Sequence, residues 1–421
     1  MRSTLFPREP VARALTLATM AVSLSTGLFY AVSALYFTRV LGLSAATVGI
    51  GLTVAGGCGV VASYAAGAAS DRLGADRVQR WAMVGWGLAL LAYALVGDVT
   101  GFVVVACVAL GMRATQGTAR QAMIARWFVG PERVATRARL RVVTNVGIGL
   151  GTVLAGVTLL LDDAAAYRAT MVAAGLLVLL ATVPLRGLNR AVPELAARVR
   201  AGAGGVANEP RGRSPLTDRT YLGAVALTAV LAMNFGLQTV GVPLWVAGYT
   251  DAPPVVISLL MVVNTVFVAL LQVPASRGTH EVLLAGLAVR RAGAFLALGC
   301  GLFAAAAYGG AVPAVALLVL AALALAAGEV FAEAGAWGLA FELADPRSAG
   351  AYQGLSQTGY AVAAMLAPAV VTLTAISHGT AGWAVLAVMF LAAGTATAGL
   401  ARRASRTRAD ESAPTVRSAV A

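Results

Sequence analysis

Gly67-Ala-Ala-Ser-Asp71-Arg72-Leu73-Gly74-Ala-Asp-Arg77 is a short polar stretch between two long apolar runs, over residues 44–69 and 80–97. The first run exceeds, and the second approaches, the roughly 20 residues that a helix needs to cross a bilayer. Before the polar stretch, Gly59, Ser63 and Gly67 recur at every fourth residue, so one helix face carries only small side chains and permits close helix packing. Asp71 extends this face by one turn, where its carboxylate can cap a neighbouring helix.

The composition favours a bilayer as the solvent of this chain. Of its 421 residues, 59% are hydrophobic and 12% are charged, whereas a soluble domain carries about 25% charged residues. So few charges cannot keep a water-exposed surface dispersed. We therefore predict an all-α membrane protein.

Twelve apolar runs are long enough to span a membrane. They cover residues 11–37, 44–69, 80–97, 101–124, 142–161, 166–187, 220–248, 254–275, 291–309, 312–341, 352–376 and 381–401. Polar residues between the sixth and seventh runs predict a linker over 189–219. We expect two six-helix bundles, 1–188 and 220–401, followed by a disordered cytoplasmic tail over 402–421.

The arginines predict the orientation of the spans. All 31 basic residues are arginine, and the net charge is +13. Apart from Arg39, Arg113 and Arg168, we assign the arginines to the cytoplasmic side by the positive-inside rule. Both termini are then cytoplasmic, which an even number of spans requires. Nucleic-acid binding is the alternative source of a basic balance, but these arginines lie mainly between apolar runs.

Catalytic and metal-binding patterns are missing from the sequence. Cys58, Cys107 and Cys300 lie inside apolar runs without metal-ligand spacing, and both histidines, His280 and His378, lie in predicted loops. There is no P-loop, GxSxG or HExxH pattern. We predict that the protein is not an enzyme and needs no cofactor.

Two motifs resemble the major facilitator superfamily. The stretch Gly67 to Arg77 is similar to its signature loop Gly-x-x-x-Asp-Arg-x-Gly, and the matching residues are Gly67, Asp71, Arg72, Gly74 and Arg77. The fourth run contains Arg113-Ala-Thr-Gln116-Gly, which is similar to the Arg-x-x-Gln-Gly motif of the family's fourth span. The resemblance implies the twelve-helix transporter fold, with the first motif as a gate and Arg113 in proton coupling. An arginine that only holds backbone carbonyls is the alternative for Arg113.

The tenth run carries two carboxylates, Glu329 and Glu333, on one helix face. Burial favours the neutral form of a carboxyl group, which suits reversible protonation. A Gly-Glu pair at this place resembles drug-exporter-like members, so we predict Glu329 as the proton site and Glu333 as its helper. The alternative is a structural pair near the inner gate.

Polar and aromatic side chains in other runs predict the substrate site. The candidates are Tyr30, Gln116, Asn145, Asn234, Gln238, Asn264 and Gln357. They predict a mixed apolar and amide-lined pocket for a small lipophilic molecule.

We expect proton-coupled efflux by a monomer in a bacterial cytoplasmic membrane. The alternatives are uptake or exchange of a sugar-like metabolite, and a non-transporting membrane sensor or scaffold.

Overall fold

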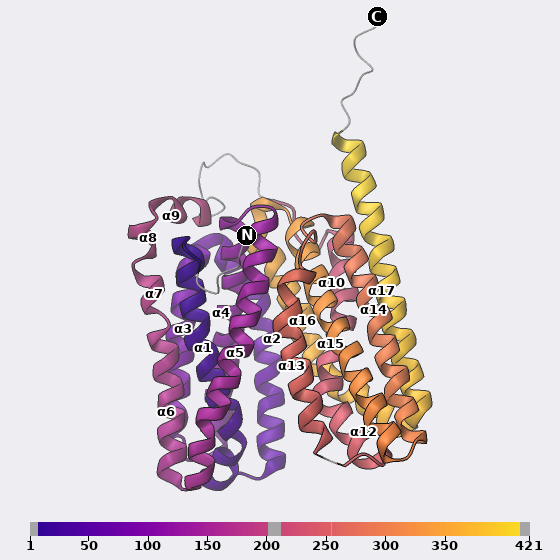
Figure 1. Ribbon diagram of the computed structural model, residues 1–421. Helices are drawn as coiled ribbons and strands as arrows, with labels where there is room; N and C mark the ends of the chain where they lie inside the picture. The colour runs from indigo at the N-terminus through magenta and orange to yellow at the C-terminus, as the bar shows by residue number, and fades with distance from the viewer. Residues whose placement is uncertain (1–6, 201–211, 254, 413–421) are drawn as a thin grey trace, which may run out of the picture. The chain divides into compact units, whose positions relative to one another are not determined.

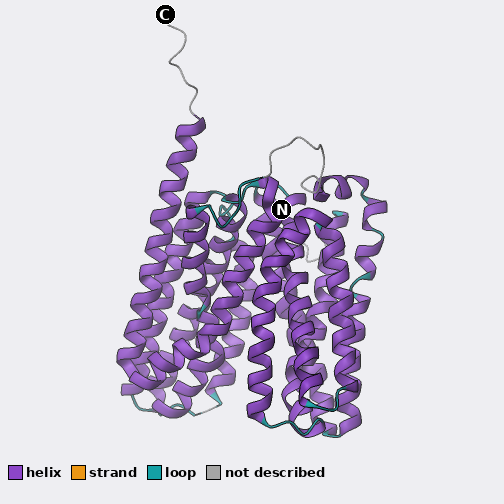
Figure 2. Ribbon diagram, turned by 180° about the vertical axis from the view of Figure 1, so that it is seen from behind, coloured by secondary structure: helices purple, strands orange, loops and turns teal. Residues whose placement is uncertain are grey.

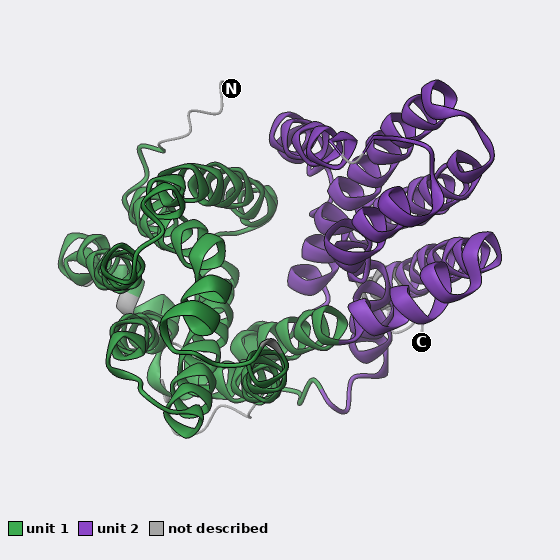
Figure 3. Ribbon diagram, turned by 90° about the horizontal axis from the view of Figure 1, so that it is seen from below, with its two compact units in different colours: residues 1–215, 345–365 green, residues 216–344, 366–421 purple. Residues whose placement is uncertain are grey.

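The computed structural model describes residues 7–200, 212–253 and 255–412, and Figures 1 and 2 show that this part of the chain is helical, with no strand. Contacts divide the chain into two compact units, coloured separately in Figure 3. Unit 1 comprises residues 1–215 and 345–365, and unit 2 comprises residues 216–344 and 366–421.

Unit 1 consists of six long helices, several short elements and the first part of α16. The long helices are α1 (Pro10–Leu35), α2 (Ala45–Leu73), α3 (Ala75–Ala92), α4 (Val99–Trp127), α5 (Pro131–Leu161) and α6 (Ala164–Leu180). The short elements are the π-helix η1 (Tyr36–Val40), the 3-10 turns η2 (Tyr93–Leu95) and η5 (Pro346–Ser348), α7 (Val183–Arg186), α8 (Leu188–Ala191) and α9 (Pro193–Arg200). α16 (Ala349–Val371) belongs to this unit up to Met365.

Unit 2 begins with a helix that is broken several times. Its parts are α10 (Arg219–Ala232), α11 (Asn234–Gly236), the π-helix η3 (Leu237–Gly241) and α12 (Val242–Tyr249). Then follow α13 (Val256–Ala275), α14 (Val282–Ala305), the 3-10 turn η4 (Ala306–Tyr308) and α15 (Ala311–Glu342). After α16 come the π-helix η6 (Thr372–Ile376) and α17 (Ser377–Ser412).

Side-chain caps set the starts of several helices. A carboxylate or hydroxyl oxygen accepts a hydrogen bond from a backbone N–H in the first turn, which would otherwise lack a partner. This cap is found at Glu9, Ser44, Asp98, Asp163 and Asp218.

Glycines allow α1 and α5 to pack closely in unit 1. A Cβ atom on Gly147 would lie 2.6 Å from the Ser23 Cβ atom of α1, and one on Gly151 would overlap the backbone carbonyl of Leu24. Side chains at these two positions would therefore separate the helices. The glycine-rich fifth run of the sequence is a helix-packing seam.

Four helix pairings recur in both units. In unit 1, α1 packs on α6, α2 on α4, and α3 on both α4 and α6. In unit 2, α10 packs on α17, α13 on α15, and α14 on both α15 and α17. When the long helices of each half are numbered by their order along the chain, these four pairs have the same numbers in both halves. This correspondence indicates an internal repeat.

Within the described residues, ten helical segments are long and apolar enough to cross a membrane. One of them, 62 residues over Pro346–Thr407, contains two of the runs predicted from the sequence. α3 is helical over most of the third predicted run but is not among the ten. Each predicted run lies mainly in helical residues.

The structure differs from the predicted domain limits at two places. Residues 345–365, expected in the second bundle, group with unit 1 because the start of α16 packs on α2. α17 continues to Ser412, so residues 402–412 are helical where a disordered tail was expected. Of the predicted linker, residues 201–211 lie outside the described residues, as do residues 413–421 of the tail.

Candidate functional site

The junction between α2 and α3 is one glycine long. Gly74 ends α2 and begins α3 with φ 91° and ψ 128°, a backbone conformation that strongly favours glycine. This sharp turn leaves Asp71 in the last turn of α2 and places Arg77 in the first turn of α3. The predicted gating residues therefore lie at two helix ends.

The Asp71 carboxylate caps the N-terminus of α16. The backbone N–H of Gly350 donates to Asp71 Oδ1 at 2.8 Å, and that of Ala351 donates to Oδ2 at 2.7 Å. Arg126 Nη2 of α4 also donates to Oδ1, at 2.5 Å. Negative charge at a helix N-terminus is stabilised by the helix dipole. The expected cap is present, and it is joined by an ion pair with Arg126.

Gly67 permits this contact between α2 and α16. A Cβ atom on Gly67 would lie 2.5 Å from the Gly350 carbonyl oxygen and 2.9 Å from Gly354 Cα. Arg72 and Arg77, in contrast, are exposed. The ion-pair partner of Asp71 is thus Arg126, which the sequence had placed among ordinary loop charges.

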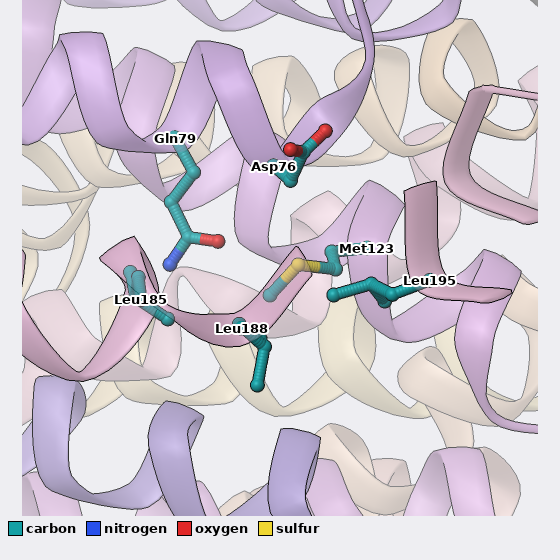
Figure 4. A pocket seen from close by; sticks show the side chains of 6 residues that line it. All are labelled: Asp76, Gln79, Met123, Leu185, Leu188 and Leu195. Carbon is teal, nitrogen blue, oxygen red and sulfur yellow. The ribbon is translucent and has the colours of Figure 1, made fainter. Parts of the chain in front are cut away.

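A small pocket lies beside this junction. Asp76, Gln79, Met123, Leu185, Leu188 and Leu195 line it, as Figure 4 shows. The Gln79 side chain is buried, and both polar atoms of its amide lack a partner among the described residues. None of the residues predicted to bind substrate lines this pocket.

Arg113 lies against two aromatic rings in unit 1. Its Cζ atom is 5.3 Å from the ring centre of Tyr30 on α1 and 6.0 Å from that of Trp86 on α3. Both distances are within the range of cation–π attraction. Tyr30 is 52% exposed, and Arg113 is also exposed. Two predicted site residues, Tyr30 and Arg113, are therefore in contact.

Arg120 is a second arginine on α4 that sequence reasoning missed. It was counted among the cytoplasmic arginines, but its side chain is partly buried, and its Nη1 atom donates to Thr19 Oγ1 of α1 at 3.4 Å. Its Nε atom is buried and has no partner among the described residues. The spacing of seven residues from Arg113 was the available signal.

Glu329 is the centre of a polar cluster in unit 2. Its side chain is 2% exposed. Gln238 Nε2 of η3 donates to Glu329 Oε2 at 2.6 Å, and Asn264 Nδ2 of α13 donates to the same oxygen at 3.2 Å. Three residues predicted separately from the sequence therefore meet at one carboxylate.

Asn234, predicted to bind substrate, lies at a helix break in unit 2. It is 1% exposed, and its Nδ2 atom donates to the Leu231 carbonyl at 2.7 Å. The helix is interrupted at Met233, and Asn234 satisfies a carbonyl that this interruption frees.

Three other predicted residues, Gln116, Asn145 and Gln357, make no hydrogen bond to Arg113 or Glu329 in the described part of the chain. Gln116 is buried, whereas Asn145 and Gln357 are partly buried. Glu333 lies one turn beyond Glu329 on α15 and is partly buried.

A profile described as Major Facilitator Superfamily matches residues 15–368. The chain belongs to the major facilitator superfamily. Members of this superfamily are membrane transporters rather than enzymes, and this chain is a multi-pass membrane protein with the superfamily's all-helical fold. A search of curated proteins found no match.

Solved structures share this fold at low sequence identity. A bacterial homologue of the iron transporter ferroportin in its outward-facing state aligns with a TM-score of 0.73 at 15% identity, covering 94% of this chain and 99% of that one. The human organic anion transporter MFSD10 aligns with a TM-score of 0.66 at 15% identity, and the alignment covers 93% of this chain and 99% of that one. The proton:xylose symporter XylE aligns with a TM-score of 0.60 at 15% identity, and the alignment covers 91% of this chain and 94% of that one.

Proposed function

We propose that this superfamily member is a proton-coupled exporter of small lipophilic molecules that works by alternating access. In this proposal, twelve spans cross a bacterial cytoplasmic membrane with both termini inside, and the protein acts as a monomer. The observation that carries the proposal is the Glu329 carboxylate, which is buried and accepts hydrogen bonds from Gln238 and Asn264.

The two amides suit both protonation states of Glu329. An ionised carboxylate only accepts hydrogen bonds, and here it receives two amide N–H groups. A protonated carboxyl group needs an acceptor for its O–H, which a rotated amide supplies through its oxygen. Neither state then leaves an unsatisfied buried group, so a proton can bind and leave without a large penalty.

Protonation at this position would change helix packing. The carboxylate connects η3, α13 and α15, and each hydrogen bond to a charged group contributes about 1.5–3 kcal/mol. A π-helical turn such as η3 is often found at functional sites. A proton on Glu329 weakens these two bonds and so shifts the balance between conformations. The Asp71 cap on α16 would hold one conformation until that shift occurs.

The test uses everted membrane vesicles that contain the full chain. Nile red, rhodamine 6G and fluorescein serve as neutral, cationic and anionic probes, and a proton gradient is imposed and then collapsed with a protonophore. We expect gradient-dependent accumulation of at least one probe, and loss of that dependence in Glu329→Gln with the protein still folded. Normal gradient-driven accumulation by Glu329→Gln would refute the coupling.

The same vesicles distinguish the direction of transport. Accumulation in everted vesicles corresponds to export from the cell, whereas accumulation only in right-side-out vesicles would favour uptake. One of the solved relatives is a proton:xylose symporter, so coupled uptake occurs within this fold. No movement of any probe in either orientation would favour a sensor or scaffold.

A further inference from the structure

Two arginines of α4 lie on one helix face. Arg113 and Arg120 are seven residues apart, which is close to two turns, so they are separated by about 10 Å along the helix axis. Their contacts on α1 follow the same line. Arg113 lies on Tyr30 and Arg120 contacts Thr19, eleven residues earlier, or about three turns.

Neither guanidinium has an acidic partner among the described residues of unit 1. Arg113 is covered by the rings of Tyr30 and Trp86. Arg120 has a long hydrogen bond to a threonine hydroxyl and a buried Nε atom without a partner among the described residues. In the described part of this unit, no carboxylate lies within ion-pair distance of either side chain.

The carboxylates in the described part of unit 1 are found at helix ends and in the loops between helices. They are Glu9, Asp71, Asp76, Asp98, Glu132, Asp162, Asp163, Glu194 and Asp345. Several have other partners, since Asp71 pairs with Arg126 and Asp162 with Arg39. Among the described residues, the middle of the unit therefore carries two positive charges and no negative one.

We propose that the transported molecule carries an anionic group that binds Arg113, with Arg120 adding positive potential. This inference deepens the proposed function by naming the substrate class, an amphiphilic organic anion. A charge at bilayer depth is costly unless water or a counter-charge meets it. A bound carboxylate, sulfonate or phosphate supplies that counter-charge.

The Arg113 side chain is exposed, so it is accessible to such a group. A guanidinium group carries five N–H donors, and aromatic rings beside it accept none of them as strongly as an anion does. The exposed ring of Tyr30 offers an apolar surface for the rest of the molecule.

The experiment compares matched acids and amides on the purified full-length protein. The probes are 2-naphthoate with 2-naphthamide, indole-3-acetate with indole-3-acetamide, and decanoate with decanamide, and the readout is Kd by isothermal titration calorimetry. We expect at least one acid to bind at least tenfold more tightly than its amide. Arg113→Gln should abolish that preference, and Arg113→Lys should retain part of it.

Two further variants complete the design. Arg120→Gln should weaken acid binding by a smaller factor than Arg113→Gln, because Arg120 acts from two turns away. Arg402→Gln removes an exposed arginine of α17 in unit 2 and should change nothing. Should Arg113→Gln fail to fold, Arg113→Lys and Arg120→Gln still report on the acid preference.

The proposal is overturned if no acid is preferred to its amide, or if the preference survives in Arg113→Gln. These outcomes are separable from those of the transport test. Gradient-driven transport of Nile red alone would retain proton coupling and remove the anion site. An Arg113-dependent acid preference without gradient-driven transport would retain the anion site and remove proton coupling.

Discussion

Asp71 shows how one residue serves several interactions. It accepts two backbone N–H groups of α16 and one guanidinium N–H of Arg126, although its side chain is only 14% exposed and that of Arg126 only 6%. Removing one partner of a buried ion pair leaves the other charge unpaired, which is more costly than losing both. The two residues should therefore be thermodynamically coupled.

Asp71→Asn and Arg126→Gln should each lower the free energy of unfolding, and the double variant should lose less than their sum. We expect a coupling of about 0.5–3 kcal/mol, measured by thermal or denaturant unfolding in detergent. Arg72→Gln, at the exposed neighbour, is the control and should change stability by less than about 0.5 kcal/mol. Strict additivity would mean that the Asp71–Arg126 pair contributes no coupling.

We expect Asp162, in the loop after α5, to make the stability of the protein depend on pH. Hydrogen bonds from Tyr167 and Arg39 hold the pKa of this carboxyl below its usual value. A depressed pKa contributes stability above the unfolded value, about 3.9, and this stability is lost as the pH falls through the folded value. Asp162→Asn keeps a residue type that tolerates the left-handed backbone here, φ 47°.

We expect the Tm of the wild type to exceed that of Asp162→Asn at pH 7, with a difference that narrows as the pH falls below about 4. The pair is exposed, so the difference should be small and should shrink in high salt. A Tm difference that is constant from pH 7 to pH 3 would contradict the role of the charge.

Sequence reasoning identified which polar residues take part in interactions better than it identified their interaction partners. It predicted a helix cap at Asp71 but not Arg126 as its ion pair, since a charge near a predicted span end looks the same whether it faces solvent or another helix. Glu329 and Gln238 are 91 residues apart, so only the fold brings them together. The hydrogen bond from Asn234 to the Leu231 carbonyl was not predicted, because the helix break at Met233 leaves no clear trace in hydropathy.

At the scale of helices, glycine spacing fixes how closely α1 and α5 approach. Gly147 and Gly151 are in contact with α1, whereas a Cβ on Gly149, between them, would meet no atom within 4 Å. Hydropathy predicts that these residues form a helix, but it does not say which glycines face a neighbour. That distinction provides a matched pair of variants.

Gly151→Ala should destabilise the protein by about 1–3 kcal/mol, because the new methyl group overlaps the Leu24 carbonyl of α1. Gly149→Ala should be neutral or stabilising by up to about 1 kcal/mol, because alanine favours helix more than glycine does. Unfolding of both variants in detergent checks the difference. Equal effects would contradict the packing seam.

At the scale of the whole molecule, the four helix pairings that recur in both units indicate an internal repeat. The arginine-rich loops predict the orientation of the spans in the membrane, since short loops rich in arginine stay cytoplasmic. Neither argument depends on the other.

We expect both termini to be cytoplasmic. A green fluorescent protein fused after residue 421 should fluoresce, and alkaline phosphatase fused at the same place should be inactive. In the predicted external loop at Asp162 and Asp163, a fused alkaline phosphatase should be active, and a fused green fluorescent protein should not fluoresce. Active phosphatase at the C-terminus would refute the twelve-span orientation.

The most direct test of the account is the pH dependence of ligand affinity, since it examines proton coupling at Glu329 without requiring transport. The ligand is whichever of the six acid and amide probes binds most tightly, and Kd is measured from pH 6 to pH 9. If the ligand and the proton exclude each other, linkage predicts that affinity rises with pH by up to about tenfold per unit. We predict this rise for the wild type and a pH-independent Kd for Glu329→Gln. A Glu329→Gln protein with the wild-type pH profile would contradict the assignment of the proton to Glu329.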